Sequence, residues 1–203
     1  MLDLAIPDTG PLITFALLGR LDLLDRFKCP ILVTDMVSEE VLRGPDTAKD
    51  KPIFEKWFGA RGNRIQTIDT TYGAMWKELS PDARLRVKRL HPNAGEQSIR
   101  EFTDKLRDTI PADDQVLVLF EEDSVKRMKF DPYVHLLHSF AFMLTLEQLR
   151  VIPSAEELHA EVLQRGRNLA KDTFERRATA KTGAEMDWQA DYETDNSIRS
   201  GPK

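Results

Sequence analysis

Short apolar runs alternate along this chain with longer segments in which apolar residues recur every three or four positions. Five of the short runs are expected to be strands, at residues 2–6, 30–34, 64–68, 115–120 and 133–137. The run at 115–120 is apolar at every position after Gln115. Such continuity is typical of a central parallel strand that is covered on both faces.

The segments between the strands show helical periodicity. Helices are expected at residues 11–27, 36–43, 53–58, 72–79, 80–90, 93–106, 139–149 and 154–167. Pro11 suits the first turn of the first helix, and Gly19 is expected to break or bend it. Asp35 should cap the second helix, and Ser154 with Glu157 forms a capping box at the start of the last. Strands that alternate with helices predict a three-layer α/β/α fold around a central parallel sheet.

The character of the chain changes near residue 169. One domain is therefore expected over residues 1–168, followed by a polar tail over residues 169–203 that is helical at first and then disordered. Trp188 and Tyr192 stand out in this tail as large aromatic side chains. A solvated tail is the favoured interpretation, and a segment that docks on a partner is the alternative.

Composition restricts the classes of partner. The chain has 203 residues and a net charge of −5, which argues against wrapping nucleic acid by bulk electrostatics but leaves room for a local basic strip. Its single cysteine, Cys29, excludes an internal disulfide and is expected to be a small buried hydrophobe in a reducing compartment. A signal peptide and an uncharged stretch of membrane-spanning length are both lacking, so a cytoplasmic protein without membrane contact is expected.

Two acidic residues lie just past expected strands at one edge of the predicted sheet and are candidates for a site. Asp8 lies two residues past the strand at 2–6, and Asp123 lies three residues past the strand at 115–120. The carboxyl ends of parallel strands share one edge of a sheet, where ligands bind, so these two acids are expected to meet there. Each also fits the simpler role of a helix N-cap. Glu121 and Glu122 are alternatives that share or replace the role of Asp123.

Helical phase selects one of two adjacent glutamates. Val37 and Val41 mark the buried stripe of the helix at 36–43. At about 100° per residue, Glu39 points away from this stripe and into solvent, whereas Glu40 flanks the core. Glu40 is therefore the preferred candidate.

Glu96 has two interpretations that the local sequence leaves open. It lies one turn before Ile99, on the inward face of its helix. It also completes a capping box with Asn93. The first interpretation adds Glu96 to the acidic cluster, and the second gives it a purely structural role.

Four acids at one edge of a sheet repel one another unless a cation lies among them. A hard divalent cation held by carboxylate oxygens and water, Mg²⁺ or Mn²⁺, is the natural occupant. The four histidines are scattered without zinc-binding spacing, and neither a Walker loop nor a dinucleotide-binding glycine motif is present.

The ordered set of motifs resembles the PIN-domain family, the metal-dependent ribonucleases that include VapC-type toxins of toxin–antitoxin pairs. The matching stretches are residues 8–13 with 19–24, 37–41, 94–99, 117–127 and 140–167. Together they cover residue 1 to about residue 168, in family order. The chain departs from many members in its third acid, a glutamate as in the Gly-Glu subgroup, in its long spacing between Glu40 and Glu96, and in its polar tail.

The resemblance implies a metal-dependent ribonuclease, the toxin of a toxin–antitoxin pair. Its acidic quartet would be both catalytic and ligands of one or two Mg²⁺ or Mn²⁺ ions: Asp8, Glu40, Glu96 and Asp123. Thr9 would support the first acid and bind substrate. RNA, an antitoxin protein and a second copy of the chain would be its partners.

Basic groups must offset the negative charge near an RNA substrate. Candidates are the runs 84–89 and 126–129, and a solvated helix face is the simpler interpretation of both. Arg127 lies nearer the expected site and is the preferred substrate-binding residue. Two other classes compete with the nuclease: a PIN-like binding or regulatory module with inert acids, and a phosphatase or receiver that uses Asp8 as phosphoryl acceptor. The phosphatase fits less well because Gly10 stands where a second aspartate is expected.

Overall fold

A computed structural model of the chain describes residues 1–42, 51–80, 82–84, 86 and 93–194. The strands are β1 (Leu2–Pro7), β2 (Ile31–Thr34), β3 (Ile65–Ile68), β4 (Gln115–Phe120), β5 (Val134–His138) and β6 (Glu175–Arg176). The α-helices are α1 (Thr9–Leu17), α2 (Asp35–Leu42), α3 (Lys51–Arg61), α4 (Thr71–Glu78), α6 (Ala94–Leu106), α7 (Asp123–Arg127), α8 (Ser139–Gln148) and α9 (Ala155–Gln164). The described residues also contain the 3-10 helices η1 (Leu21–Arg26), η2 (Gly62–Arg64) and η3 (Trp188–Asp191).

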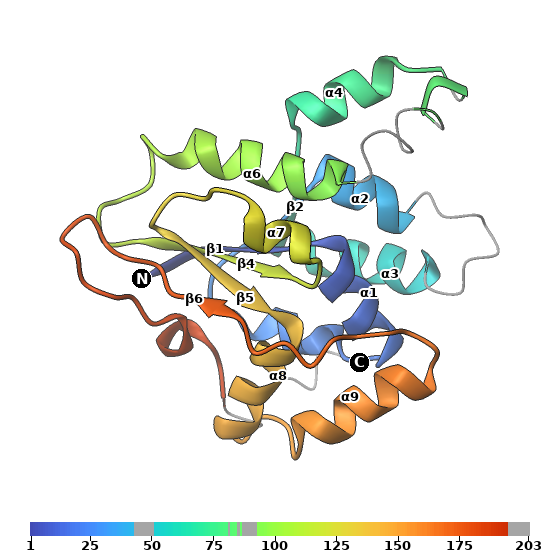
Figure 1. Cartoon of the computed structure of the whole chain (residues 1–203). Coiled ribbons are helices and arrows are strands. Elements are labelled where there is room, and N and C mark those ends of the chain that lie inside the picture. Colours follow the sequence, from blue (N-terminus) through green and yellow to red (C-terminus); the bar gives the residue numbers. More distant parts are fainter. Residues whose placement is uncertain (43–50, 81, 85, 87–92, 195–203) are drawn as a thin grey trace.

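The strands form one sheet in the order β3-β2-β1-β4-β5-β6. The first five are parallel, and β6 pairs with β5 in the antiparallel direction. Helices flank this sheet, with α4 and α6 on one side and α8 and α9 on the other (Figure 1). The predicted α/β/α fold is therefore confirmed. Every residue of β4 is buried, as its continuous apolar run predicted.

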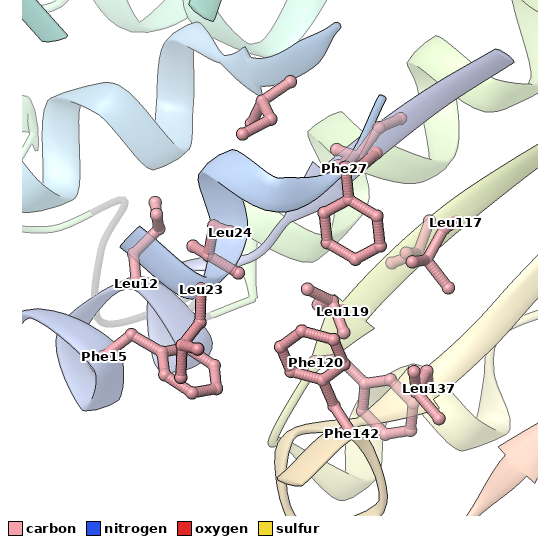
Figure 2. Close-up of a cluster of buried hydrophobic side chains, with 14 of the residues drawn as sticks. Leu12, Phe15, Leu23, Leu24, Phe27, Leu117, Leu119, Phe120, Leu137 and Phe142 are labelled. Carbon is pink, nitrogen blue, oxygen red and sulfur yellow. The ribbon is translucent and has the colours of Figure 1, made fainter. Parts of the chain in front are cut away.

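The core on the α8 side of the sheet is rich in aromatic rings. Phe142 of α8 packs edge-on against Phe15 of α1 and is stacked with Phe27, the residue after η1. Figure 2 shows these rings together with leucines of β4, β5, α1 and η1. Packing against this apolar layer holds β1 and α1 in place. It thereby positions Asp8, the residue between them.

The first expected helix is divided in the structure, at the glycine that was expected to break or bend it. The segment 11–27 forms α1 and η1 rather than one helix, because Gly19 adopts a φ of 68° and ends the first of them. The basic helix expected over 80–90 lies largely outside the described residues. Ser154 accepts a hydrogen bond from the Glu157 N–H at 3.2 Å, as expected for a capping residue. None of the helices described here is long and apolar enough to span a membrane.

Residues 169–194 are part of the domain, and the expectation of a solvated tail was wrong for them. Within this segment the backbone forms β6 and η3 instead of the expected α-helix. Trp188 is 0% exposed and contacts the rings of Phe27 and Phe142. The segment folds back because the α8 side of the sheet offers an aromatic surface that Trp188 and Tyr192 cover. Residues 195–203 lie outside the described part of the chain.

Cys29 is buried, as expected of a small hydrophobe. Burial raises the pKa of its thiol to about 12. The thiolate form is therefore rare at neutral pH, and the side chain is a poor nucleophile.

Gly73 is required by the close approach of α4 to α2. A Cβ on Gly73 would lie 1.6 Å from Oδ2 of Asp35, whose carboxylate accepts hydrogen bonds from the Thr70 N–H at 3.0 Å and the Thr70 hydroxyl at 2.7 Å. Gly73→Ala is expected to lower the free energy of unfolding by about 1–3 kcal/mol, because the added methyl group displaces Asp35 from these bonds. Urea denaturation measures the change.

Gly59 in α3 provides the matched control for this prediction. A Cβ there has nothing within 4 Å among the described residues. Gly59→Ala should stabilise the protein by about 0.4–1 kcal/mol because the unfolded chain loses freedom. Equal effects of the two substitutions would contradict the proposed role of Asp35.

Candidate functional site

The order in which successive strands are added to the sheet reverses between β1 and β4. The carboxyl ends of these two strands therefore mark the switch point of the sheet. From β1 the chain proceeds to β2 and β3 on one side, and it then returns to place β4 on the other side of β1. The Asp8 N–H donates to the Leu119 carbonyl at 2.9 Å, which fastens the two strand ends together. Crevices at such switch points are the usual ligand sites of open α/β sheets.

A pocket of about 430 Å³ opens at this point. Four carboxylates line it: Asp8, Glu40, Glu96 and Glu122. Thr9 and Arg167 also line it. Of the residues proposed from the sequence, the structure brings together Asp8, Glu40, Glu96 and Thr9. Within the part of the chain that is described, Asp123 and Arg127 are not among its lining residues.

Asp8 is the most deeply buried of these acids, with 3% of its surface exposed. Burial raises the pKa of its carboxyl well above the ordinary value, and the negative charges of Glu96, Glu40 and Glu121 raise it further. A hydrogen bond from the Thr9 N–H acts in the opposite direction. The site therefore holds a carboxylate whose ionised form is disfavoured without a cation nearby.

Thr9 links the first two acids. Its hydroxyl donates to Oε2 of Glu40 at 2.5 Å, and its backbone N–H bonds to Asp8. The side chain thus supports the second acid rather than the first, and it holds α1 against α2. A Cβ on Gly95 would lie 3.4 Å from both Oδ1 of Asp8 and Oε1 of Glu40, so both carboxylates border the space above this glycine.

Glu39, the neighbour of Glu40, was expected to face solvent. It is instead half-buried and accepts a hydrogen bond from Nε1 of Trp76 at 3.0 Å. The reason is that α4 packs beside α2 and supplies a donor that the local sequence of α2 does not show. Glu40, on the other flank, faces the pocket.

The structure separates the two interpretations of Glu96. Within the described chain, the side chain of Asn93 makes no capping hydrogen bond at the start of α6. Glu96 is 7% exposed and accepts a hydrogen bond from the Ser124 hydroxyl at 3.1 Å. Burial raises the pKa of Glu96, and the nearby charge of Glu122 adds to the rise.

Asp123, the fourth proposed acid, points away from the pocket. Its side chain is 72% exposed and pairs with Nζ of Lys126 at 2.7 Å, one turn along α7. The hydrogen bond and charge of Lys126 lower the pKa of Asp123. Glu122 lines the pocket in its place, because α7 begins at Asp123 and turns that side chain onto the outer face with Lys126.

Arg167 is a site residue that the sequence did not single out. Its Nη2 donates to Oε2 of Glu121 at 2.7 Å and to the Gly10 carbonyl at 3.2 Å, and its Nε donates to the Thr14 hydroxyl at 2.8 Å. These bonds tie α1, the end of β4 and the segment after α9 into one wall. Arg127, the basic residue proposed for substrate, is exposed on α7.

The pocket contains oxygen atoms of the kind that hard divalent cations bind. They are carboxylate and hydroxyl oxygens, the ligands that Mg²⁺ and Mn²⁺ take. Among the described residues, however, no three His, Cys, Asp or Glu side chains are gathered closely enough to form a complete ligand set. An ion here would need water for part of its coordination, as Mg²⁺ commonly does.

The chain matches no protein-family model, no curated protein and no solved structure.

Proposed function

We propose that this protein is a metal-dependent endoribonuclease that hydrolyses RNA phosphodiester bonds. The observation that carries the proposal is the shared pocket of Asp8, Glu40 and Glu96 at the switch point of the sheet. Burial and mutual repulsion disfavour the ionised forms of Asp8 and Glu96 there. A divalent cation would relieve that repulsion.

The acids of the pocket and the hydroxyls bonded to them have parts in the proposed reaction. Asp8, Glu40 and Glu96 would hold Mg²⁺ or Mn²⁺, directly or through water, while the hydroxyls of Thr9 and Ser124 orient Glu40 and Glu96. A bound cation lowers the pKa of water and stabilises charge on phosphoryl oxygens. Glu122 is exposed in the pocket, where it can accept the proton of the attacking water as the water oxygen bonds to phosphorus and the leaving oxygen departs.

The choice of RNA rests on the resemblance to the PIN-domain family. The same resemblance supports the further proposals of a toxin role, an antitoxin partner and a homodimer. A cytoplasmic location is supported by the single buried cysteine, which fits a reducing compartment.

Cleavage of a cellular RNA pool tests the function directly. We expect fragments in Mg²⁺ or Mn²⁺ and none in EDTA. Intact RNA in Mg²⁺ and Mn²⁺ would contradict the proposal.

Separate substitutions of the two adjacent acids after β4, Glu122 and Asp123, test which of them acts in the site. Glu122→Gln is expected to lower the cleavage rate about 100-fold, the size of a general-base contribution. Asp123→Asn should change the rate by less than about twofold, because it removes only an exposed ion pair. Cleavage rates of a labelled RNA measure both effects. A larger loss of rate for Asp123→Asn than for Glu122→Gln would show that Asp123, not Glu122, acts in the site.

The incomplete convergence of the acids favours a second candidate, an inert PIN-like binding or regulatory module. Mn²⁺ titration by calorimetry separates the two. If the protein is the nuclease, it should bind Mn²⁺. Asp8→Asn should abolish this binding, and Asp123→Asn should preserve it. Heat of binding that is absent, or that is unaffected by Asp8→Asn, would favour the inert module.

A further inference from the structure

Helix α7 is a short helix of five residues that directly follows Glu122, a lining residue of the acidic pocket. Glu122 is the N-cap of this helix, so the direction of its side chain depends on how α7 lies. The Ser124 hydroxyl holds one side of α7 by donating to Oε1 of Glu96 at 3.1 Å. A helix this short is stabilised mainly by contacts with its neighbours, and these contacts also set its orientation.

Lys126 holds the other side of α7 through a carboxylate of the C-terminal segment. Its Nζ pairs with Asp123 in the same helix at 2.7 Å and with Oδ2 of Asp172. The side chains of Lys126 and Asp172 are only 24% and 23% exposed, so solvent screens this ion pair less than a surface pair. Because Asp123 belongs to α7, its bond to Lys126 cannot fix the helix relative to the sheet.

The segment around Asp172 is itself attached to the sheet. The Phe174 carbonyl accepts a hydrogen bond at 3.0 Å from the N–H of His138, the last residue of β5. The Phe174 ring packs edge-on against Phe120, the last residue of β4, with ring centroids 5.7 Å apart. Strand β6 then begins at the next residue and lies beside β5 (Figure 1).

The two attachments of α7 lie on different faces of the helix. Ser124 and Lys126 are about 200° apart at about 100° per residue. Ser124 joins α7 to α6 through Glu96, and Lys126 joins it to the end of the sheet through Asp172. Loss of either attachment would leave α7 free to turn about the other.

We propose that Asp172 is a positioning residue for the acidic pocket: through Lys126 it fixes α7 in the orientation that directs Glu122 into the pocket. The inference rests on the proposed function, in which Glu122 accepts the proton of the attacking water. A displacement of about 1 Å at such a group is enough to slow a reaction greatly. The C-terminal segment thus serves the reaction as well as the core.

Asp172→Asn removes the charge that holds Lys126. The amide keeps an oxygen for the hydrogen bond that the Phe174 N–H donates to Oδ1 of Asp172 at 2.9 Å, so the local turn can persist. Asp123→Asn is the matched control, since it removes the other carboxylate paired with Lys126 and leaves the attachment to the sheet. Lys126→Gln breaks the same attachment from the α7 side and serves if Asp172→Asn does not fold.

Hydrogen exchange in α7 tests the attachment without RNA. The Val125 and Met128 amides are the probes, because they donate to the Glu122 and Val125 carbonyls, both at 3.1 Å. We expect both amides to exchange about tenfold faster in Asp172→Asn and within about twofold of the native rate in the control. Unchanged exchange in Asp172→Asn would overturn the inference.

Cleavage of a labelled RNA in Mg²⁺ tests whether Asp172 acts through Glu122. Asp172→Asn should lower kcat about tenfold and leave KM unchanged. In a Glu122→Gln background the same substitution should change kcat by less than about twofold, because the group that it positions is already lost. An unchanged kcat, or an equal loss in both backgrounds, would overturn the inference, since damage to the fold alone slows both proteins alike.

Failure of the proposed function is distinguishable from failure of this inference. Intact RNA after incubation of the native protein with Mg²⁺ would contradict the nuclease. The exchange rates of the Val125 and Met128 amides would still decide whether Asp172 holds α7 to the sheet.

Discussion

Asp8→Asn is expected to abolish RNA hydrolysis and, in metal-free buffer at neutral pH, to make the protein more stable. The loss of rate should be at least about 100-fold, because a cation-holding oxygen and its charge are removed from the pocket. The gain in free energy of unfolding should be about 0.5–2 kcal/mol. It arises because an amide of the same shape replaces a buried carboxylate that repels Glu96 and Glu40.

The pH dependence of that gain follows from the raised pKa of Asp8. The folded protein holds the Asp8 proton more tightly than the unfolded chain, whose aspartates titrate near pH 3.9. The native residue therefore contributes full stability below that pH and loses it as the pH rises through the folded pKa. The stability difference between variant and native protein should grow from acidic to neutral pH in EDTA, and Mn²⁺ should reverse it by stabilising only the native protein.

Urea denaturation at pH 5 and pH 8, with EDTA or Mn²⁺, measures these changes. Asp123→Asn is the matched control. Because Lys126 lowers the pKa of Asp123, removal of the Asp123 carboxylate should lower the stability at neutral pH. A less stable Asp8→Asn protein at pH 8 in EDTA would show that the acids of the pocket do not repel one another.

Trp188→Ala should destabilise the protein by about 3–5 kcal/mol, the cost of removing a large ring from a packed core. Trp188 is fully buried, and its ring contacts Phe27, Phe142 and Tyr192. Chemical denaturation followed by circular dichroism gives the change. Met75→Ala, at a 65% exposed position, should stay within about 0.5 kcal/mol of the native protein. A cost below about 1 kcal/mol for Trp188→Ala would mean that the C-terminal segment is not needed for the core.

The sheet could be predicted from the sequence because its strands carry local patterns. The continuous run of β4 and the alternation of strands with helices indicate a parallel sheet. The C-terminal segment could not be predicted in the same way. Its strand β6 is two residues long, and its main anchor, Trp188, contacts Phe27 and Phe142 far away in the sequence. Such long-range contacts leave no local pattern.

The residues of the candidate site could likewise be predicted from the sequence only in part. Asp8 follows from its place at a strand end, and Glu40 follows from helical phase. Choosing between Glu122 and Asp123 requires the residue at which α7 begins, because that residue sets the direction of both side chains. Arg167 depends on three contacts with segments that are distant in sequence, so its position could be found only in three dimensions.

The bonds of Arg167 have a consequence for the order in which the chain is synthesised. Arg167 follows Gly10, to which it donates a hydrogen bond, by 157 residues. A growing chain on the ribosome therefore has β1 and Asp8 long before it has the arginine that closes the wall beside them. The pocket gains its final shape only after residue 167 has emerged from the ribosome.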